Sequence, residues 1–219
     1  MKKLKEEIIE NKNLKYKTHN GYYIFGNCNV DETAIIYPNV YFFGECSVGA
    51  NTIIYPGCVI TSSQIGADCE IKSSYIECSQ IKDHVIVGPF AHIRPNSNIS
   101  NNCKIGNFVE VKASSLSDGC KASHLAYIGD AVVGKDCNIG CGVIFVNYNG
   151  NQKNKTIIGN NCFIGSNVNL IAPLEVSDTT YVCAGTTVTK NTKNGDFVIG
   201  RPREIIKSFR AQKYLKNKN

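Results

Sequence analysis

Aliphatic residues return at every sixth position along most of this chain, and many of them are followed by glycine, as in Ile105-Gly106 and Ile164-Gly165. Hexads that start on these aliphatics begin at residues 24, 30, 36, 42, 48, 54, 60, 65, 71, 76, 81, 87, 93, 99, 105, 111, 116, 122, 128, 133, 139 and 145, and later at 158, 164, 170, 176, 182 and 188. Self-similarity at such a period is the signature of a solenoid. Each hexad predicts a short strand and a turn, and three hexads close one triangular coil.

The repeat predicts an all-β fold: a parallel β-helix of about nine coils, with neighbouring strands roughly 4.8 Å apart. Its regular part covers residues 24–200. Residues 1–23 are expected to form a short N-terminal helix or cap. Apolar residues near helical spacing predict a basic C-terminal helical tail over 201–219.

The hexad period breaks in one polar stretch, residues 147–156. In a solenoid, an insertion becomes a protruding loop and often forms part of a binding face. Neither of the common glycine-rich nucleotide loops is found in the sequence.

Most of the 11 cysteines follow the repeat. Eight of them occupy the fifth hexad position, at residues 28, 46, 58, 69, 103, 120, 137 and 162. This position points into the tight corner of a coil, where a small side chain fits. We therefore interpret these cysteines as small core residues whose reduced thiols indicate a reducing compartment.

Composition narrows the class of protein. There is no apolar run of the roughly 18 residues that a membrane span needs, and the first residues lack the apolar core of a secretory signal. The net charge of +6 is small and lies largely in the C-terminal tail. It favours anionic small molecules and is weak evidence for nucleic acid. We expect a cytoplasmic protein without a nucleic-acid partner.

Two cations stack in the predicted coils. Arg94 and Lys112 both occupy the second position of hexads that lie one coil apart. Stacked like charges repel each other unless an anion lies between them. A phosphate fits this description, since arginine offers a planar fork and lysine a point charge. The alternative is a pair of solvated surface cations.

A second column stacks Asn107, His124 and Cys141 at the third hexad position. An imidazole that is neutral near pH 7 is suited to accept a proton, which makes His124 a candidate general base. A purely structural histidine is the alternative. His84 and His92 fall at other positions, so the pattern does not favour a zinc site.

From about Gly88 to Arg201 the sequence resembles the acetyltransferase domain of a bifunctional bacterial enzyme family, glucosamine-1-phosphate N-acetyltransferase joined to N-acetylglucosamine-1-phosphate uridylyltransferase. The matching stretches include VGPFAHIRP, IGNFVEVK, KASHLAYIGD and CNIGCGVIFVNYNG. The pieces outside the repeat, RP, K-x11-H-x2-Y and NY-x-G, are more specific than single hexads. The uridylyltransferase domain is missing from this sequence, so nucleotidyl transfer is not expected.

The resemblance implies a left-handed β-helix that works as a homotrimer, with active sites between subunits. It implies acetyl transfer from acetyl-CoA to glucosamine 1-phosphate, a step of UDP-N-acetylglucosamine and cell-wall biosynthesis that needs no metal. Its implied site residues are His124 as general base; Arg94, Lys112, Tyr127, Asn138 and Lys153 for the sugar phosphate; and Cys141, Asn147, Tyr148, Ser166, Ala184 and Arg201 for acetyl-CoA.

The sequence departs from the family pattern at two positions of the site. Cys141 replaces the usual alanine, and Asn149 replaces the usual aspartate of NYDG. Two other functions stay open at this point: acetylation of a nucleotide-linked amino sugar, and a non-catalytic β-helix that binds a sugar nucleotide or serves as a scaffold. The site residues occur together, which argues against the scaffold because a scaffold needs none of them.

Overall fold

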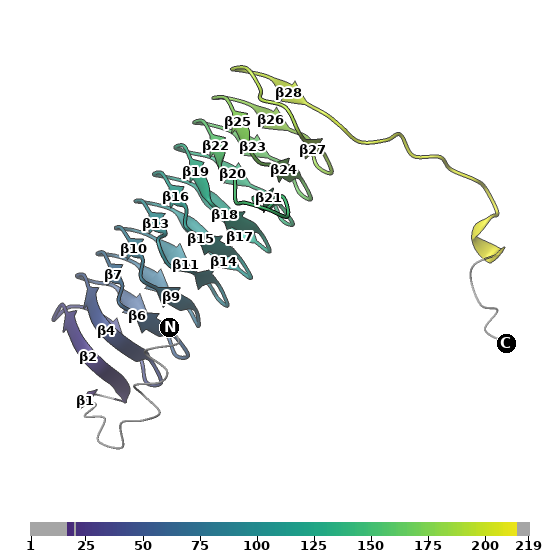
Figure 1. Ribbon diagram of the computed structural model, residues 1–219. Coiled ribbons are helices and arrows are strands. Elements are labelled where there is room, and N and C mark those ends of the chain that lie inside the picture. Colours follow the sequence, from purple (N-terminus) through teal and green to yellow (C-terminus); the bar gives the residue numbers. More distant parts are fainter. Residues whose placement is uncertain (1–16, 20, 214–219) are drawn as a thin grey trace.

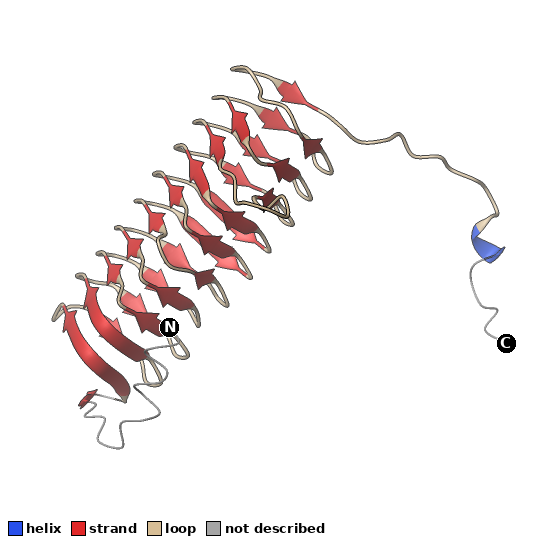
Figure 2. Cartoon of the chain, viewed as in Figure 1, coloured by secondary structure: helices blue, strands red, loops and turns tan. Residues whose placement is uncertain are grey.

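The computed structural model describes residues 17–19 and 21–213, which form a left-handed parallel β-helix (Figure 1). Almost all regular structure in it is strand (Figure 2). The strands stack in three ladders, which we call the first, second and third faces of the prism. The expected fold class is confirmed.

The first face has ten strands, one per coil, against the nine or so expected. They are β3 (Ile35–Ile36), β5 (Ile53–Ile54), β8 (Glu70–Ile71), β11 (Ile86–Val87), β14 (Lys104–Asn107), β17 (Lys121–His124), β20 (Asn138–Ile139), β23 (Phe163–Ile164), β26 (Tyr181–Val182) and β28 (Phe197–Val198).

The second face begins with two long strands that bend around a corner of the prism. Its strands are β2 (Tyr22–Val30), β4 (Tyr41–Val48), β6 (Val59–Thr61), β9 (Tyr75–Glu77), β12 (His92–Ile93), β15 (Glu110–Lys112), β18 (Tyr127–Gly129), β21 (Ile144–Val146), β24 (Asn169–Ile171) and β27 (Thr187–Val188).

The third face continues from the end of β4. Its strands are β7 (Gln64–Ile65), β10 (Gln80–Ile81), β13 (Asn98–Ile99), β16 (Ser115–Leu116), β19 (Ala131–Val133), β22 (Thr156–Ile158) and β25 (Leu174–Val176). The long polar insertion connects β21 to β22 and occupies residues 147–155, while Thr156, the last residue of the expected loop, begins strand β22.

The first hexad residue of each strand points inward and builds the core. Ile54, Ile105 and Val182 of the first face are fully buried. Of the eight cysteines at the fifth position, seven are buried and Cys28 is half-buried, and all 11 cysteines are free thiols. Several donate to main-chain carbonyl groups, as Cys120 does to Gly134. The interpretation of these cysteines as small core residues is confirmed.

The two ends differ from expectation. A short strand, β1 (Lys17–His19), pairs antiparallel with β2 at the N-terminus, and the helix expected before it lies outside the described residues. The C-terminal helix is wrong over its described part. After β28 the chain runs away from the prism, and it holds only a single 3₁₀ turn, η1 (Ala211–Lys213) (Figure 1).

The physical reason for the missing C-terminal helix is a lack of packing. Ile205, Ile206 and Phe209 are 82%, 85% and 90% exposed. A short helix is marginal in water without an apolar surface to cover, so a helical pattern alone does not stabilise it. Among the described residues, no helix has the length and hydropathy that a membrane crossing requires.

Candidate functional site

Two stacked cations lie on the second face, as the hexad register predicts. Arg94 directly follows β12 and Lys112 ends β15, and these strands pair in register. Arg94 Nη1 donates to Glu110 Oε1 at 2.7 Å, and Lys112 Nζ donates to Asp130 Oδ2 at 2.9 Å. Each cation therefore has its own carboxylate partner. The sequence argument that two stacked cations need an anion between them is therefore corrected, because these carboxylates already offset the repulsion without a bound phosphate.

The ion pair of Arg94 leaves it available to a ligand. The side chains of Arg94 and Glu110 are 41% and 38% exposed. Exposed pairs of this kind contribute only about 0.2–1 kcal/mol. A phosphate offers stronger, charge-assisted hydrogen bonds to the same guanidinium. Arg94 can exchange its carboxylate for a phosphate at small cost.

Lys153 of the inserted loop completes a group of three cations, which we call the cation cluster: Arg94, Lys112 and Lys153. Lys153 in its neutral form can accept a hydrogen bond from Lys112, and this effect together with the Asp130 carboxylate raises the pKa of Lys112. The neighbouring Lys112 lowers the pKa of Lys153, and Arg94 adds to this effect. The insertion thus folds back onto the second face and brings a third positive charge there.

Asn147 anchors the start of this loop. It is buried, and its Nδ2 donates to the Tyr127 hydroxyl at 3.2 Å and to Asp130 Oδ2. Tyr148 is 57% exposed, forms an antiparallel bridge with Lys153, and donates its hydroxyl to Gly150. These contacts fix the base of the loop beside the cation cluster.

Gly129 creates the space that these side chains need. It follows Lys112 in the column of the second face. A Cβ at this position would lie 2.5 Å from the Tyr127 hydroxyl and 2.7 Å from Asn147 Nδ2. Contacts this short require the two side chains to move.

If the cation cluster binds a phosphorylated acceptor, as the family resemblance implies, we expect Gly129→Ala to raise KM for that acceptor by about tenfold, because displacing Tyr127 and Asn147 moves the loop that carries Lys153. Steady-state kinetics with varied acceptor would measure this, and the melting temperature would report on the fold. A matched control is Gly185→Ala, since no atom lies within 4 Å of a Cβ there, although its φ is +73°. A KM for Gly129→Ala equal to that of the parent protein would contradict the prediction.

His124 ends β17 on the first face. Its Nδ1 lies 2.7 Å from Oδ1 of Asn107 in the coil below, as the predicted column requires. An amide oxygen only accepts hydrogen bonds, so Nδ1 carries the proton and Nε2 keeps its lone pair. The ring is exposed, so this lone pair is accessible. The geometry suits a general base.

The residues expected to contact acetyl-CoA continue the same column. The register of the first face aligns Ala122 with Ile139, Ile139 with Ile164, and Ile164 with Val182. Cys141, Ser166 and Ala184 each follow such a residue by two positions, as His124 does, and all three are exposed. Arg201 reaches the same column, since its Nη1 donates to the Ala184 carbonyl at 3.0 Å. The main-chain N–H of Cys141 donates no hydrogen bond within the described part of the chain.

The predicted site residues thus form two groups on one chain. The cation cluster, Tyr127 and Asn147 lie on or beside the second face, whereas His124 and Asn138 lie on the first. The first and second faces meet at a corner that carries three exposed apolar residues, Phe90, Phe108 and Leu125, which we call the corner ridge. Phe90 and Phe108 stack with their ring centroids 5.6 Å apart.

Two carboxylates beside the cation cluster were missed in the sequence. Asp130 binds both Lys112 and Asn147. Glu77 lies one coil before Arg94, with its side chain only 9% exposed. A signal for Glu77 exists in the sequence, because Glu77 follows an aliphatic core residue by one position, as Arg94 and Lys112 do. Within the described residues, no three histidine, cysteine or acidic side chains form a group that could hold a metal ion.

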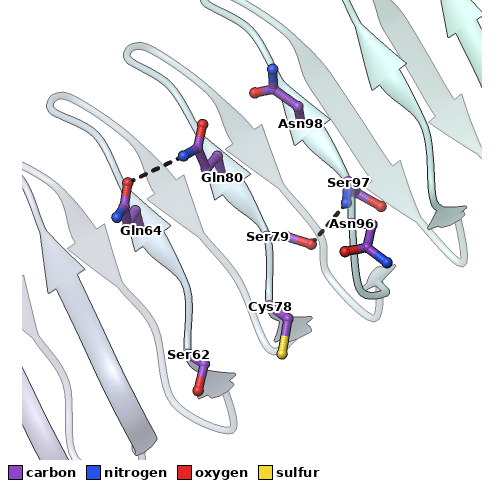
Figure 3. Close-up of a pocket in the computed structure, with 8 residues that line it drawn as sticks. All are labelled: Ser62, Gln64, Cys78, Ser79, Gln80, Asn96, Ser97 and Asn98. Carbon is purple, nitrogen blue, oxygen red and sulfur yellow. Dashed lines mark hydrogen bonds between the residues drawn. The ribbon is translucent and has the colours of Figure 1, made fainter.

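Away from these residues, a hollow of about 420 Å³ lies between the second and third faces, nearer the N-terminus (Figure 3). Its lining is small and uncharged: Ser62, Gln64, Cys78, Ser79, Gln80, Asn96, Ser97 and Asn98. Gln80 donates to Gln64 at 3.4 Å, and the exposed Cys78 thiol is its one titratable side chain. The arrangement offers no general base and no charge for an anionic substrate.

Comparison with known proteins identifies relatives of this chain. A family model described as the GMPPB C-terminal domain matches residues 75–148. A bifunctional protein GlmU of Clostridium novyi (strain NT) is 47% identical over 195 residues, which are 89% of this chain and 43% of that protein. The GlmU protein of Clostridioides difficile (strain 630) is 47% identical over 194 residues, 89% of this chain and 42% of its own length.

Structural comparison supports the fold alone. A UDP-N-acetylglucosamine acyltransferase from Campylobacter jejuni superposes with a TM-score of 0.52 at 13% sequence identity, over 76% of this chain and 69% of that chain. The chain spans less than half the length of the GlmU proteins that it matches. Over most of its own length, it is nonetheless a relative of the proteins named bifunctional protein GlmU, which confirms the family resemblance of its motifs.

Proposed function

We propose that this protein transfers the acetyl group of acetyl-CoA to the amine of glucosamine 1-phosphate, giving N-acetylglucosamine 1-phosphate and free CoA. The observation that carries the proposal is the cation cluster of Arg94, Lys112 and Lys153 on the second face, together with His124 and its free Nε2 at the edge of the adjoining first face. A sugar phosphate needs the cations, and amine acetylation needs the base. The relatives named GlmU support the same assignment.

In the proposed reaction, the sugar phosphate binds the cation cluster and Tyr127. His124 Nε2 accepts a proton from the amine as its nitrogen attacks the thioester carbonyl. The C–N bond forms, the C–S bond breaks, and the CoA thiolate leaves and takes up a proton. The unpaired N–H of Cys141 is suited to stabilise the oxyanion, an interaction worth about 2.7–4 kcal/mol in other enzymes. Because this contact uses the main chain, cysteine in place of alanine preserves it.

Acetyl-CoA is proposed to lie along the His124 column. Cys141, Ser166 and Ala184 present exposed positions in three successive coils above the base. Arg201 flanks that column from the tail through its bond to the Ala184 carbonyl. The Asn147–Tyr148 pair of the inserted loop is proposed to contact acetyl-CoA as well. This arrangement runs the cofactor parallel to the axis of the prism. Asn138, which lies on the same face as His124, is proposed to contact the sugar.

We further propose a homotrimer in the cytoplasm, with each active site between two chains. On a single chain the base and the cation cluster occupy different faces, and the corner ridge between them exposes Phe90, Phe108 and Leu125 by 60%, 56% and 57%. Contiguous exposed apolar side chains indicate a protein contact. The free cysteines support a reducing compartment.

The test is a CoA thiol-release assay with acetyl-CoA and a panel of amines: glucosamine 1-phosphate, glucosamine and a nucleotide-linked glucosamine. We expect turnover to be fastest with glucosamine 1-phosphate. A preference for the nucleotide-linked sugar would instead support the alternative acceptor. Absence of acetyl-CoA binding by calorimetry would favour a non-catalytic β-helix.

Lys153 gives this site a predicted alkaline limit. Because Lys112 lowers the pKa of Lys153, this side chain loses its charge at a lower pH than an ordinary lysine, whose pKa is about 10.4. KM for glucosamine 1-phosphate should therefore rise as the pH approaches the ordinary lysine pKa of about 10.4 from below. In Lys153→Arg the charge persists, and KM should stay flat over this range. Parallel KM profiles for the two proteins would contradict this account.

A further inference from the structure

A nearly buried carboxylate lies on the far side of Arg94 from the rest of the cation cluster. Glu77 ends β9, and the pairing of β9 with β12 places it one coil before Arg94, in the column that continues to Lys112. Its side chain is 9% exposed, and its Oε1 lies 3.7 Å from His92 Nε2. That nitrogen is buried and has no hydrogen-bond partner. Within the described residues, the contact with His92 is the one ion pair of Glu77, and it joins opposite charges only when the imidazole is protonated, so Arg94 is the nearest permanent cation to this carboxylate in its column.

This carboxylate lines a cavity of about 480 Å³. The walls are formed by Glu77, His92, Arg94, Pro95 and Glu110. Two carboxylates face one guanidinium, and that guanidinium is engaged by Glu110 at 2.7 Å. With a neutral His92, the cavity carries an excess of one negative charge. Arg94 belongs both to this acidic cavity and to the cation cluster.

Arg94 thus divides a basic region from an acidic one. On one side lie Lys112 and Lys153, and on the other lies Glu77. The inserted loop and Asp130 occupy the end of the cation cluster remote from Arg94. With that end of the column closed, a second phosphate attached to the bound one, on the side away from the sugar, would lie toward the acidic cavity.

We propose that Glu77 is a specificity-determining residue that selects acceptors with a single phosphate by repelling the second phosphate of a nucleoside-diphosphate amino sugar. The inference rests on the proposed function, because it takes the cation cluster as the phosphate site. Discrimination built on a repulsive element is a common device in specific recognition, and like charges brought together are strongly unfavourable. A repulsive Glu77 would favour glucosamine 1-phosphate over a nucleotide-linked amino sugar, the two acceptors that the sequence left open.

The test compares the affinities of glucosamine 1-phosphate and UDP-glucosamine by calorimetry. Glu77→Gln keeps the size of the side chain and removes its charge. We expect it to shift the ratio of the two Kd values by about tenfold in favour of UDP-glucosamine. The matched control is Glu70→Gln, which removes an exposed carboxylate paired with Lys72 on the first face and should leave the ratio unchanged. A ratio that moves equally little in both variants would overturn the proposal.

A second measurement uses the unaltered protein and does not depend on the folding of a variant. Raising the salt from about 0.05 to 0.5 M shortens the screening length and weakens the repulsion of the second phosphate. Both affinities should fall, but the gap between the two ligands should narrow. A gap that stays constant or widens would also overturn the proposal.

These readouts separate this proposal from the proposed function. If the protein binds both ligands with the expected Kd shift but releases no thiol from acetyl-CoA, the acetyl transfer fails and the role of Glu77 stands. If glucosamine 1-phosphate is acetylated and the Kd ratio does not respond to Glu77→Gln, the role of Glu77 fails and the acetyl transfer stands.

Discussion

Replacing His124 with alanine is expected to lower kcat by about 10²–10⁴-fold, the contribution of a positioned acid or base in other enzymes. The physical reason is the hydrogen bond from Nδ1 to Asn107, which holds the ring and leaves Nε2 free to accept the proton of the amine. The side chain is exposed and absent from the core, so its loss should not unfold the β-helix. Thiol release under saturating acetyl-CoA and acceptor would measure kcat.

His84→Ala is the matched control for this experiment. His84 is also exposed at the end of a coil, and its Nδ1 lies 3.9 Å from Asp68, remote from the candidate site. The His84→Ala protein should turn over the acceptor at the rate of the parent protein. A His124→Ala protein whose kcat stays within about twofold of that rate would remove His124 as the general base.

The effect of His124→Ala should appear in kcat rather than in KM. In the proposed site, the acceptor phosphate binds the cation cluster on the second face, which the substitution does not touch. A change confined to KM would therefore assign His124 to binding instead of proton transfer.

The stacking of the site residues could be predicted because, in a solenoid, residues that are one coil apart in the sequence lie next to each other in space. Hexad counting alone placed Asn107 beneath His124 and Arg94 beneath Lys112, and both pairs are found in register. The coils are 16–18 residues long in most places, so counting hexads instead of residues was essential. The small residues at the fifth position followed from the same steric rule.

Side-chain partners could not be predicted in this way. Register places Lys112 beside Gly129, but the lysine turns to Asp130 at the corner, which depends on rotamers and not on spacing. The prediction of a C-terminal helix was wrong for a different reason. Its apolar residues follow a helical period, yet on this chain they have no surface to cover. Periodicity therefore predicts structure where the repeat itself supplies the packing partner.

Phe108→Glu is expected to lower kcat/KM by at least about 10²-fold, because even small displacements of reacting groups have effects of this size. Phe108 is 56% exposed at the centre of the corner ridge, between the face that carries His124 and the face that carries the cation cluster. If a second chain packs there to complete the site, a carboxylate at this position must be desolvated at the interface or the interface must open. Sedimentation of the variant should then show monomers, while the parent protein sediments as a trimer.

The folding of the Phe108→Glu chain itself should be preserved. Its backbone φ is +57°, which strains phenylalanine and glutamate alike, and the side chain lies outside the core. Val132→Glu provides the matched control, since Val132 is an exposed apolar residue of the third face, 40% exposed and away from the ridge. It should remain trimeric and active. A Phe108→Glu protein that stays trimeric with parental kcat/KM would show that the ridge is no part of a subunit contact, and the base and the phosphate site would then have to meet on one chain.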